Sequence, residues 1–345
     1  MTVLATEPFT LDLVEPLVTA TGPMRRREGI AIRLGSTEPI GVGEATPLAG
    51  WTESFVTCRR TIASVDRPND AIEAGRLDGT PAARHAISLA IADRRARREG
   101  RSLARIFGGT ASTDRLSVHR SIGLASPADT AERAALAVDT GYETIKVKVG
   151  SDTIEQDVSR VAAIRSAIGS AVAIRLDANG AWTRAEAEAA LSALAVYDID
   201  FVEQPLAPAD PDGLGSLESP IPVAVDEGLI GRSMEDVAAC FETVDVAILK
   251  PMVLGGVDRC LAVADLADWT DTTTVVTTTV DAVIARTAAV HLAAAIDPDG
   301  THGLATGDYL ASDIGPDPAP VRDGMIHVPT GPGLGTDGPW EVEDG

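Results

Sequence analysis

Residues 142–148 read Tyr-Glu-Thr-Ile-Lys-Val-Lys, a short apolar run that ends in a polar side chain and is followed by a segment of helical composition. The same pattern recurs along the chain, with polar ends at Asp177, Glu203, Asp226, Lys250 and Thr277. Successive ends lie 23 to 29 residues apart, about the length of one strand with its crossover helix. This alternation predicts an α/β fold with a buried parallel sheet. Functional side chains at the strand ends favour a (β/α) barrel, and a doubly wound sheet is the alternative.

The barrel pattern covers residues 116–305, and the rest of the chain reads differently. Residues 1–115 combine expected antiparallel strands with an expected helix, which is typical of an α+β capping domain. The expected strands and helix are 3–14, 30–35, 40–45 and 81–98. The tail, 306–345, is rich in Gly, Pro and Asp, and we expect it to pack back and complete the capping domain.

Composition excludes several classes of function. The net charge of −22 would repel phosphate backbones, so we expect no nucleic-acid partner. No run of about 18 apolar residues and no secretory leader is visible, which argues against a membrane and for the cytoplasm. The scattered Cys58, Cys240 and Cys260 fit a reducing compartment. Acidic residues are spread along the whole chain, which is typical of a surface suited to high salt. The sequence is also compatible with a homo-oligomer.

Lysine is almost absent from this chain. Of its 29 basic residues three are lysine, namely Lys146, Lys148 and Lys250, and the other 26 are arginine. A lysine amine can lose its proton near neutral pH, whereas a guanidinium cannot. The three positions therefore become candidates for proton transfer, with codon bias as the alternative explanation.

The carboxylates at the strand ends suggest a metal site. In a barrel, Asp177, Glu203 and Asp226 would end three adjacent strands at one mouth. Three carboxylates held together need a cation, and oxygen ligands without His or Cys suit Mg²⁺ or Mn²⁺. Taken singly, each has an ordinary structural explanation, such as a turn at Asp177 or a helix cap at Asp226.

The lysines would flank this site. Lys146 and Lys148 lie two apart on a strand, so they point to the same face, and Lys250 ends a strand across the mouth. Removing a proton α to a carboxylate needs a base beside a stabilised dianionic enediolate. An amine can be that base, and like-charge repulsion between Lys146 and Lys148 would help to lower its pKa. The partner is then a small carboxylate, and a barrel that has lost activity and serves as a scaffold is the non-enzymatic alternative.

These motifs resemble the enolase superfamily, in its muconate-lactonizing subgroup. The matching strings are Lys146-Val-Lys148, Asp177-Ala-Asn179-Gly180, Glu203-Gln204-Pro205, Asp226-Glu227, Lys250-Pro251 with Gly255-Gly256, and Gly41-Val-Gly43-Glu44 in the capping part. The resemblance implies a modified TIM barrel, a divalent metal bound by the three carboxylates, and lysines on both faces of the substrate. It also implies outer positions for Asn179 and Glu227, and a loop from Leu48 to Glu53 that reaches over the substrate.

Within that subgroup the chain is most similar to o-succinylbenzoate synthases. The resemblance implies a lyase of menaquinone biosynthesis, in which Lys148 is both base and acid and Lys250 stabilises charge. The alternative is an N-acylamino acid racemase or a dipeptide epimerase. Dipeptide epimerases often carry Asp-x-Asp near the last strand, where this chain has a lone Asp308. Thr279 and Asp281, expected near the substrate, stand where the family usually has other residues.

Overall fold

The barrel strands are short, parallel and almost wholly buried. The computed structural model describes residues 3–19, 22–35, 39–109, 114–208 and 211–335. One sheet runs in the order β11–β10–β9–β8–β7–β6–β5, and its strands are parallel. These strands are β5 (Arg120–Ile122), β6 (Thr144–Lys148), β7 (Ala173–Asp177), β8 (Ile199–Glu203), β9 (Val223–Val225), β10 (Val246–Leu249) and β11 (Thr273–Val276).

A short seam joins the two edges of this sheet. β12 (Thr301–His302) pairs in parallel with β4 (Arg115–Val118), and Thr277, after β11, bridges to Gly303. His119 alone separates β4 from β5, and its N–H donates to the carbonyl of His302 at 2.9 Å. The ring therefore closes, which confirms the barrel and excludes the doubly wound alternative.

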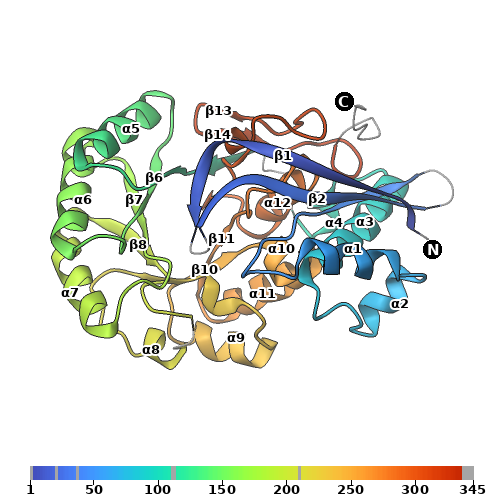
Figure 1. The fold of residues 1–345 in the computed structure, drawn as a ribbon, viewed down its shortest axis with the longest axis horizontal. Helices are drawn as coiled ribbons and strands as arrows, with labels where there is room; N and C mark the ends of the chain where they lie inside the picture. Colours follow the sequence, from blue (N-terminus) through green and yellow to red (C-terminus); the bar gives the residue numbers. More distant parts are fainter. Residues whose placement is uncertain (1–2, 20–21, 36–38, 110–113, 209–210, 336–345) are drawn as a thin grey trace.

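Helices cover the outside of the barrel, as Figure 1 shows for α5, α6 and α7 along one flank. Each follows its strand, as the sequence period predicts. The barrel helices are α5 (Pro127–Asp139), α6 (Ile154–Ile168), α7 (Arg184–Leu194), α8 (Pro211–Gly215), α9 (Met234–Phe241), α10 (Pro251–Leu254), α11 (Val257–Trp269) and α12 (Val283–Ile296).

The N-terminal part is a three-stranded antiparallel sheet packed on helices, beside the barrel in Figure 1. Its elements are β1 (Val3–Thr19), β2 (Gly22–Leu34), β3 (Gly41–Ala45), α1 (Phe55–Ala63), α2 (Pro68–Glu73), α3 (Pro81–Glu99) and α4 (Leu103–Ile106). α3 packs so closely against β3 that a Cβ atom placed on Gly43 would lie 2.0 Å from the carbonyl oxygen of Ala86. The β1–β2 hairpin is longer than the sequence predicted, because cross-strand pairing extends through the arginines before Ile30.

The C-terminal segment contacts both parts. β14 (Met325–His327) pairs with β4 of the barrel and with β13 (Val321–Arg322). Further along, Gly333 exchanges backbone hydrogen bonds with Arg101 and Leu103 of the N-terminal part. The domain limits at 115 and 305 stay a prediction.

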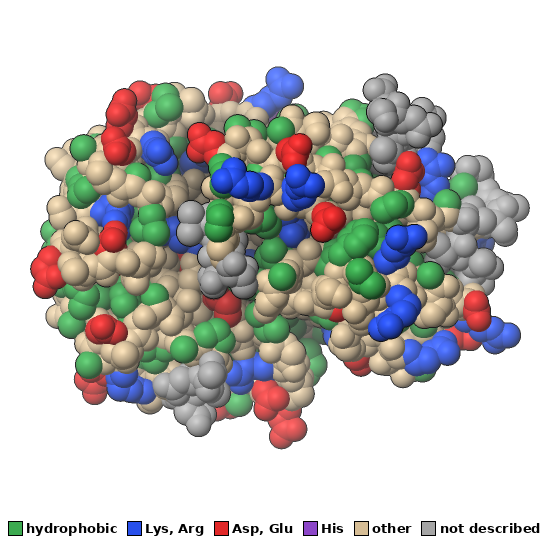
Figure 2. Space-filling model, in the orientation of Figure 1, with side chains coloured by type: hydrophobic (Ala, Val, Ile, Leu, Met, Phe, Trp, Pro, Cys, Tyr) green, Lys and Arg blue, Asp and Glu red, His purple; other side chains and the backbone are tan. Residues whose placement is uncertain are grey.

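Charged side chains of both signs are dispersed over the face drawn in Figure 2. Among the described residues, no helix combines the length and the apolar character that crossing a membrane requires.

Candidate active site

Strand register brings the predicted residues to one rim of the barrel. In the parallel pairs, Lys148 lies beside Asp177, and Asp177 lies beside Glu203. Glu203 pairs with Ala224, so Asp226, two residues further, points to the same face. Lys250 follows β10, which is four strands away from β6 in the sheet order. Half of an eight-stranded ring separates the two lysines, so they approach the mouth from opposite sides.

Each of the three lysines touches a carboxylate of this row. The ammonium nitrogen of Lys146 is 2.6 Å from Oε2 of Glu203 and 3.1 Å from Oδ2 of Asp177. Lys148 is 3.1 Å from the same oxygen of Asp177, and Lys250 forms an ion pair with Asp226. Asp226 and Lys250 also interact electrostatically with Glu203, so the three lysines and three carboxylates lie in one cluster.

The donors fit a hard divalent cation. The three carboxylates are nearly inaccessible to solvent, and their six oxygens are hard ligands of the kind that Mg²⁺ prefers. No described residue donates a hydrogen bond to Oε1 of Glu203, a buried atom that normally requires a partner. Within the described ranges, however, no three Asp, Glu, His or Cys side chains are gathered as a ready-made metal cage. The carboxylates are paired with lysines, so a metal would take oxygens that the ammonium groups now contact.

Burial and neighbouring charges raise the pKa of one carboxyl group in this cluster and lower the pKa of another. Burial and the neighbouring Asp177 raise the pKa of Glu203 to about 8, although Lys146 opposes this. Burial acts against ionisation of Asp177 too, but the ammonium groups of Lys146 and Lys148 hold its pKa well below the usual range. Burial lowers the pKa of Lys146, yet the carboxylates of Asp177 and Glu203 outweigh it and raise that pKa.

A second layer of polar side chains holds the strand ends. Asn179 accepts a hydrogen bond from Lys148 and donates one to Oε1 of Glu227 at 2.8 Å. Gln204 was not among the predicted site residues, although it lies in the quoted Glu203-Gln204-Pro205 string. Its Oε1 accepts from the N–H groups of Asp226 and Gly228, both at 3.0 Å, so it orients the end of β9.

Thr279 and Asp281 lie in a different network from the carboxylate row. The Thr279 hydroxyl donates to Asp281, whose carboxylate faces the buried Arg27 of β2 at 4.0 Å. Arg27 also donates to the carbonyl of Thr46 at 2.6 Å. Glu44 of β3 completes this junction by accepting from the N–H groups of Ala282 and Ala285, both at 2.8 Å. The pair therefore connects the barrel to the N-terminal sheet, and a role at the substrate stays a prediction for both.

Trp51 is a site residue that sequence reasoning did not identify. It belongs to the loop from Leu48 to Glu53, which was expected to reach over the substrate. Its ring lies over the ammonium of Lys250, 4.2 Å from nitrogen to ring centroid. That distance is within the range of a cation–π contact. No motif in the sequence pairs these two positions, which are 199 residues apart.

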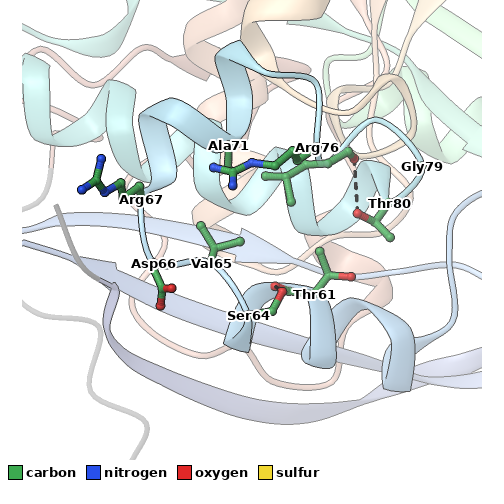
Figure 3. A pocket seen from close by; sticks show the side chains of 10 residues that line it. Thr61, Ser64, Val65, Asp66, Arg67, Ala71, Arg76, Gly79 and Thr80 are labelled. Atoms are coloured by element: carbon green, nitrogen blue, oxygen red, sulfur yellow. Dashed lines mark hydrogen bonds between the residues drawn. The ribbon is translucent and has the colours of Figure 1, made fainter.

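A hollow in the described structure lies away from these residues. It has a volume of about 440 Å³ and is lined by residues between Thr61 and Thr80. Figure 3 shows the side chains of Arg76, Ser64 and Thr80 around it, while Arg67 extends away. None of the lysines or carboxylates described above is among its lining residues, so this hollow is separate from the candidate site.

Comparison with known proteins identifies the family of this chain. The model of the family described as "Enolase C-terminal domain-like" matches residues 129–342. A hydrophobic dipeptide epimerase from Enterococcus faecalis is 30% identical over 86% of this chain and 89% of its own length.

Solved structures agree over nearly the whole chain. The N-succinyl Arg/Lys racemase of Bacillus cereus has a TM-score of 0.88 at 26% identity, with 97% of this chain and 95% of that one covered. A dipeptide epimerase from Enterococcus faecalis V583, complexed with Mg and the dipeptide L-Leu-L-Tyr, has a TM-score of 0.86 at 26% identity, covering 97% and 99%.

Proposed function

Because this chain belongs to the enolase superfamily, we propose that it is a racemase or epimerase that inverts the carbon α to the carboxylate of an N-acylated amino acid. The observation that carries the proposal is the placement of Lys148 and Lys250, which reach the same carboxylate row from opposite sides of the barrel mouth. A 1,1-proton transfer needs one acid/base group on each face of the reacting carbon.

The two lysines exchange roles between the two directions of the reaction. For one enantiomer, the neutral amine of Lys148 takes the α-proton, and the C–H electron pair moves into the carboxylate to give an enediolate. The ammonium of Lys250 then donates its proton to the opposite face, which restores the carboxylate with inverted configuration. The other enantiomer follows the reverse path. Asp177, Glu203 and Asp226 would hold Mg²⁺, whose positive charge would stabilise the enediolate.

The o-succinylbenzoate synthase expected from the sequence gives way to this alternative. A dehydratase needs one lysine for proton transfer, and its second lysine supplies charge alone. The relatives named above are epimerases and a racemase, and none of them is that lyase. Enzymatic activity within the superfamily is retained, while lyase chemistry and menaquinone biosynthesis are not supported.

An acyl group fits the amino end of the substrate better than a free ammonium does. Residues 301–310 contain a single acid, Asp308, and its carboxylate accepts from Arg120 at 2.9 Å. That pairing leaves Asp308 poorly suited to bind the ammonium of a dipeptide. Dipeptide epimerization remains the second candidate, because the matched relatives include dipeptide epimerases.

The decisive experiment follows the α-proton by NMR in D₂O. We expect the protein with Mg²⁺ to convert each enantiomer of an N-succinylamino acid into the other and to introduce deuterium at the α-carbon. Parallel assays with dipeptides and with the succinyl-hydroxycyclohexadiene carboxylate separate the three activities. A kcat/KM that favours dehydration of the cyclohexadiene would reject the proposal.

Single lysine variants provide the matched controls. Lys250→Arg should abolish inversion, since guanidinium is not an effective acid or base, with a loss of at least about 10²-fold. It should still exchange the α-proton of the enantiomer that faces Lys148, and Lys148→Arg should show the opposite preference. Equal exchange of both enantiomers by either variant would contradict a two-base mechanism.

A further inference from the structure

The two acid/base lysines differ in their access to water. The side chain of Lys148 is 40% exposed, whereas that of Lys250 is 13% exposed. Lys148 is held by Asp177 and Asn179, which both come from the barrel. Lys250 contacts Asp226 of the barrel on one side and the ring of Trp51 on the other. One group is therefore open to solvent, and the other is covered by the capping part.

The loop that carries Trp51 is fixed at both ends. On one side, Arg27 of β2 donates to the carbonyls of Thr46 and Pro47, at 2.6 and 3.2 Å. On the other, the carboxylate of Glu53 accepts from the N–H groups at the start of α3, Ala82 at 3.1 Å and Ala83 at 2.8 Å.

Bonds within the loop add to this rigidity. The Thr52 hydroxyl accepts from the N–H of Leu48 at 2.9 Å, and the N–H of Trp51 donates to the Leu48 carbonyl at 3.0 Å. The turn that carries Trp51 is thus held in place by hydrogen bonds to β2 and to α3. A turn that is fixed by hydrogen bonds keeps an aromatic ring in place at a low cost in conformational entropy.

We propose that Trp51 is a positioning residue whose ring shields the ammonium of Lys250 from bulk water, so that the two lysines exchange protons with solvent at unequal rates. The indole face attracts the ammonium and excludes water from one side of it. The barrel carboxylate Asp226 holds the other side.

This inference rests on the proposed function where it concerns catalysis. A proton taken by Lys148 exchanges with solvent before it can return, whereas a proton taken by Lys250 stays as one of the three hydrogens of that ammonium and can return to the same carbon. In D₂O, recovered substrate should therefore gain more deuterium per return for the enantiomer that faces Lys148 than for the other, which keeps part of its original protium.

The shield itself can be tested without any substrate, because the chain has only three lysines. Timed acetylation with acetic anhydride, read by peptide mass spectrometry, reports each lysine separately. We expect Lys148 to react first in the wild-type protein. Trp51→Ala should raise the rate at Lys250 by about threefold, the ratio of the exposed fractions 40% and 13%, and leave Lys146 unchanged.

Two further variants serve as controls. Trp51→Phe keeps an aromatic face and should restore slow labelling of Lys250. Trp269→Ala makes the same chemical change at a side chain that is 87% exposed on α11, and should alter none of the three rates. Lys250 reacting as fast as Lys148 in the wild-type protein, or Trp51→Ala accelerating all three lysines equally, would overturn the proposal.

The isotope experiment then separates two failures. Racemization with equal deuterium uptake into both recovered enantiomers would overturn the inference and leave the proposed function standing. Absence of racemization with Lys250 still shielded in the labelling assay would reject the proposed function and support the role of Trp51. Unequal uptake that becomes equal in Trp51→Ala and is restored in Trp51→Phe supports both.

Discussion

At the scale of single residues, the choice of lysine over arginine singled out the groups that we propose for proton transfer. The chain uses arginine for almost every cation, yet each of its three lysines reaches one cluster of carboxylates. Arginine could make similar ion pairs, but it could not release a proton near neutral pH. The residue type thus carried information about chemistry that the position in the chain alone did not.

Glu203 allows a prediction about metal binding. Its pKa is raised to about 8 by burial and by Asp177, so below that pH the carboxyl holds a proton that Mg²⁺ must displace. The apparent Kd for Mg²⁺ should therefore rise about fivefold from pH 8 to pH 7 and about ninefold more from pH 7 to pH 6. Isothermal titration calorimetry in buffers of different ionisation enthalpy measures both the affinity and the released proton. Glu203→Gln serves as the control that lacks this proton, and an affinity equal at pH 6 and pH 8 would disprove the assignment.

At the scale of elements, the N-terminal sheet supplies the cap of a barrel helix. α12 begins after Ala282, which has no polar side chain to satisfy the first N–H groups of the helix. Glu44 of β3 takes that role by accepting from Ala282 and Ala285. Elements separated by more than 230 residues are thereby joined through one buried carboxylate.

Removing this carboxylate should weaken the joint between the two parts. Glu44→Ala leaves two buried donors without a partner, and we expect a loss of about 3 kcal/mol in the free energy of unfolding. Urea unfolding followed by circular dichroism measures it. Thr183→Ala removes an ordinary helix cap on α7 and should cost only about 1 kcal/mol. A loss at Glu44 no larger than at Thr183 would show that the junction is unimportant for stability.

At the scale of the whole molecule, charge is the dominant property. The net charge of −22 is distributed over the chain, and Figure 2 shows acidic side chains dispersed over one face. Like charges repel one another in the compact state, and salt screens that repulsion beyond a Debye length of about 10 Å at 0.1 M.

Stability should consequently depend on salt. We expect the midpoint of thermal unfolding to rise when KCl is increased from 0.1 M to 2 M, because screening relieves repulsion in the folded state. Differential scanning calorimetry without Mg²⁺ isolates this effect from metal binding, and a sucrose series controls for preferential exclusion. A midpoint that falls over the same range of KCl would contradict the electrostatic explanation.

The sequence by itself predicted the parallel α/β repeat and the residues at one edge of it, and it favoured a barrel over a doubly wound sheet. A repeat of 23 to 29 residues requires parallel strands with crossovers, and polar ends of parallel strands meet at one edge. Lys148, Asp177 and Lys250 could be predicted because each depends only on its place within a local strand.

Only the tertiary structure decided the features that join distant segments. The closing strand β12 has two residues, too few to produce a periodic signal, and its pairing with β4 depends on the fold of the whole ring. The contact of Trp51 with Lys250 and that of Asp281 with Arg27 likewise arise because the capping part docks on the barrel. Local sequence patterns indicate which face of an element is buried, but not which distant side chain covers that face. For Lys250 the covering side chain is Trp51, and this contact governs the access of Lys250 to solvent.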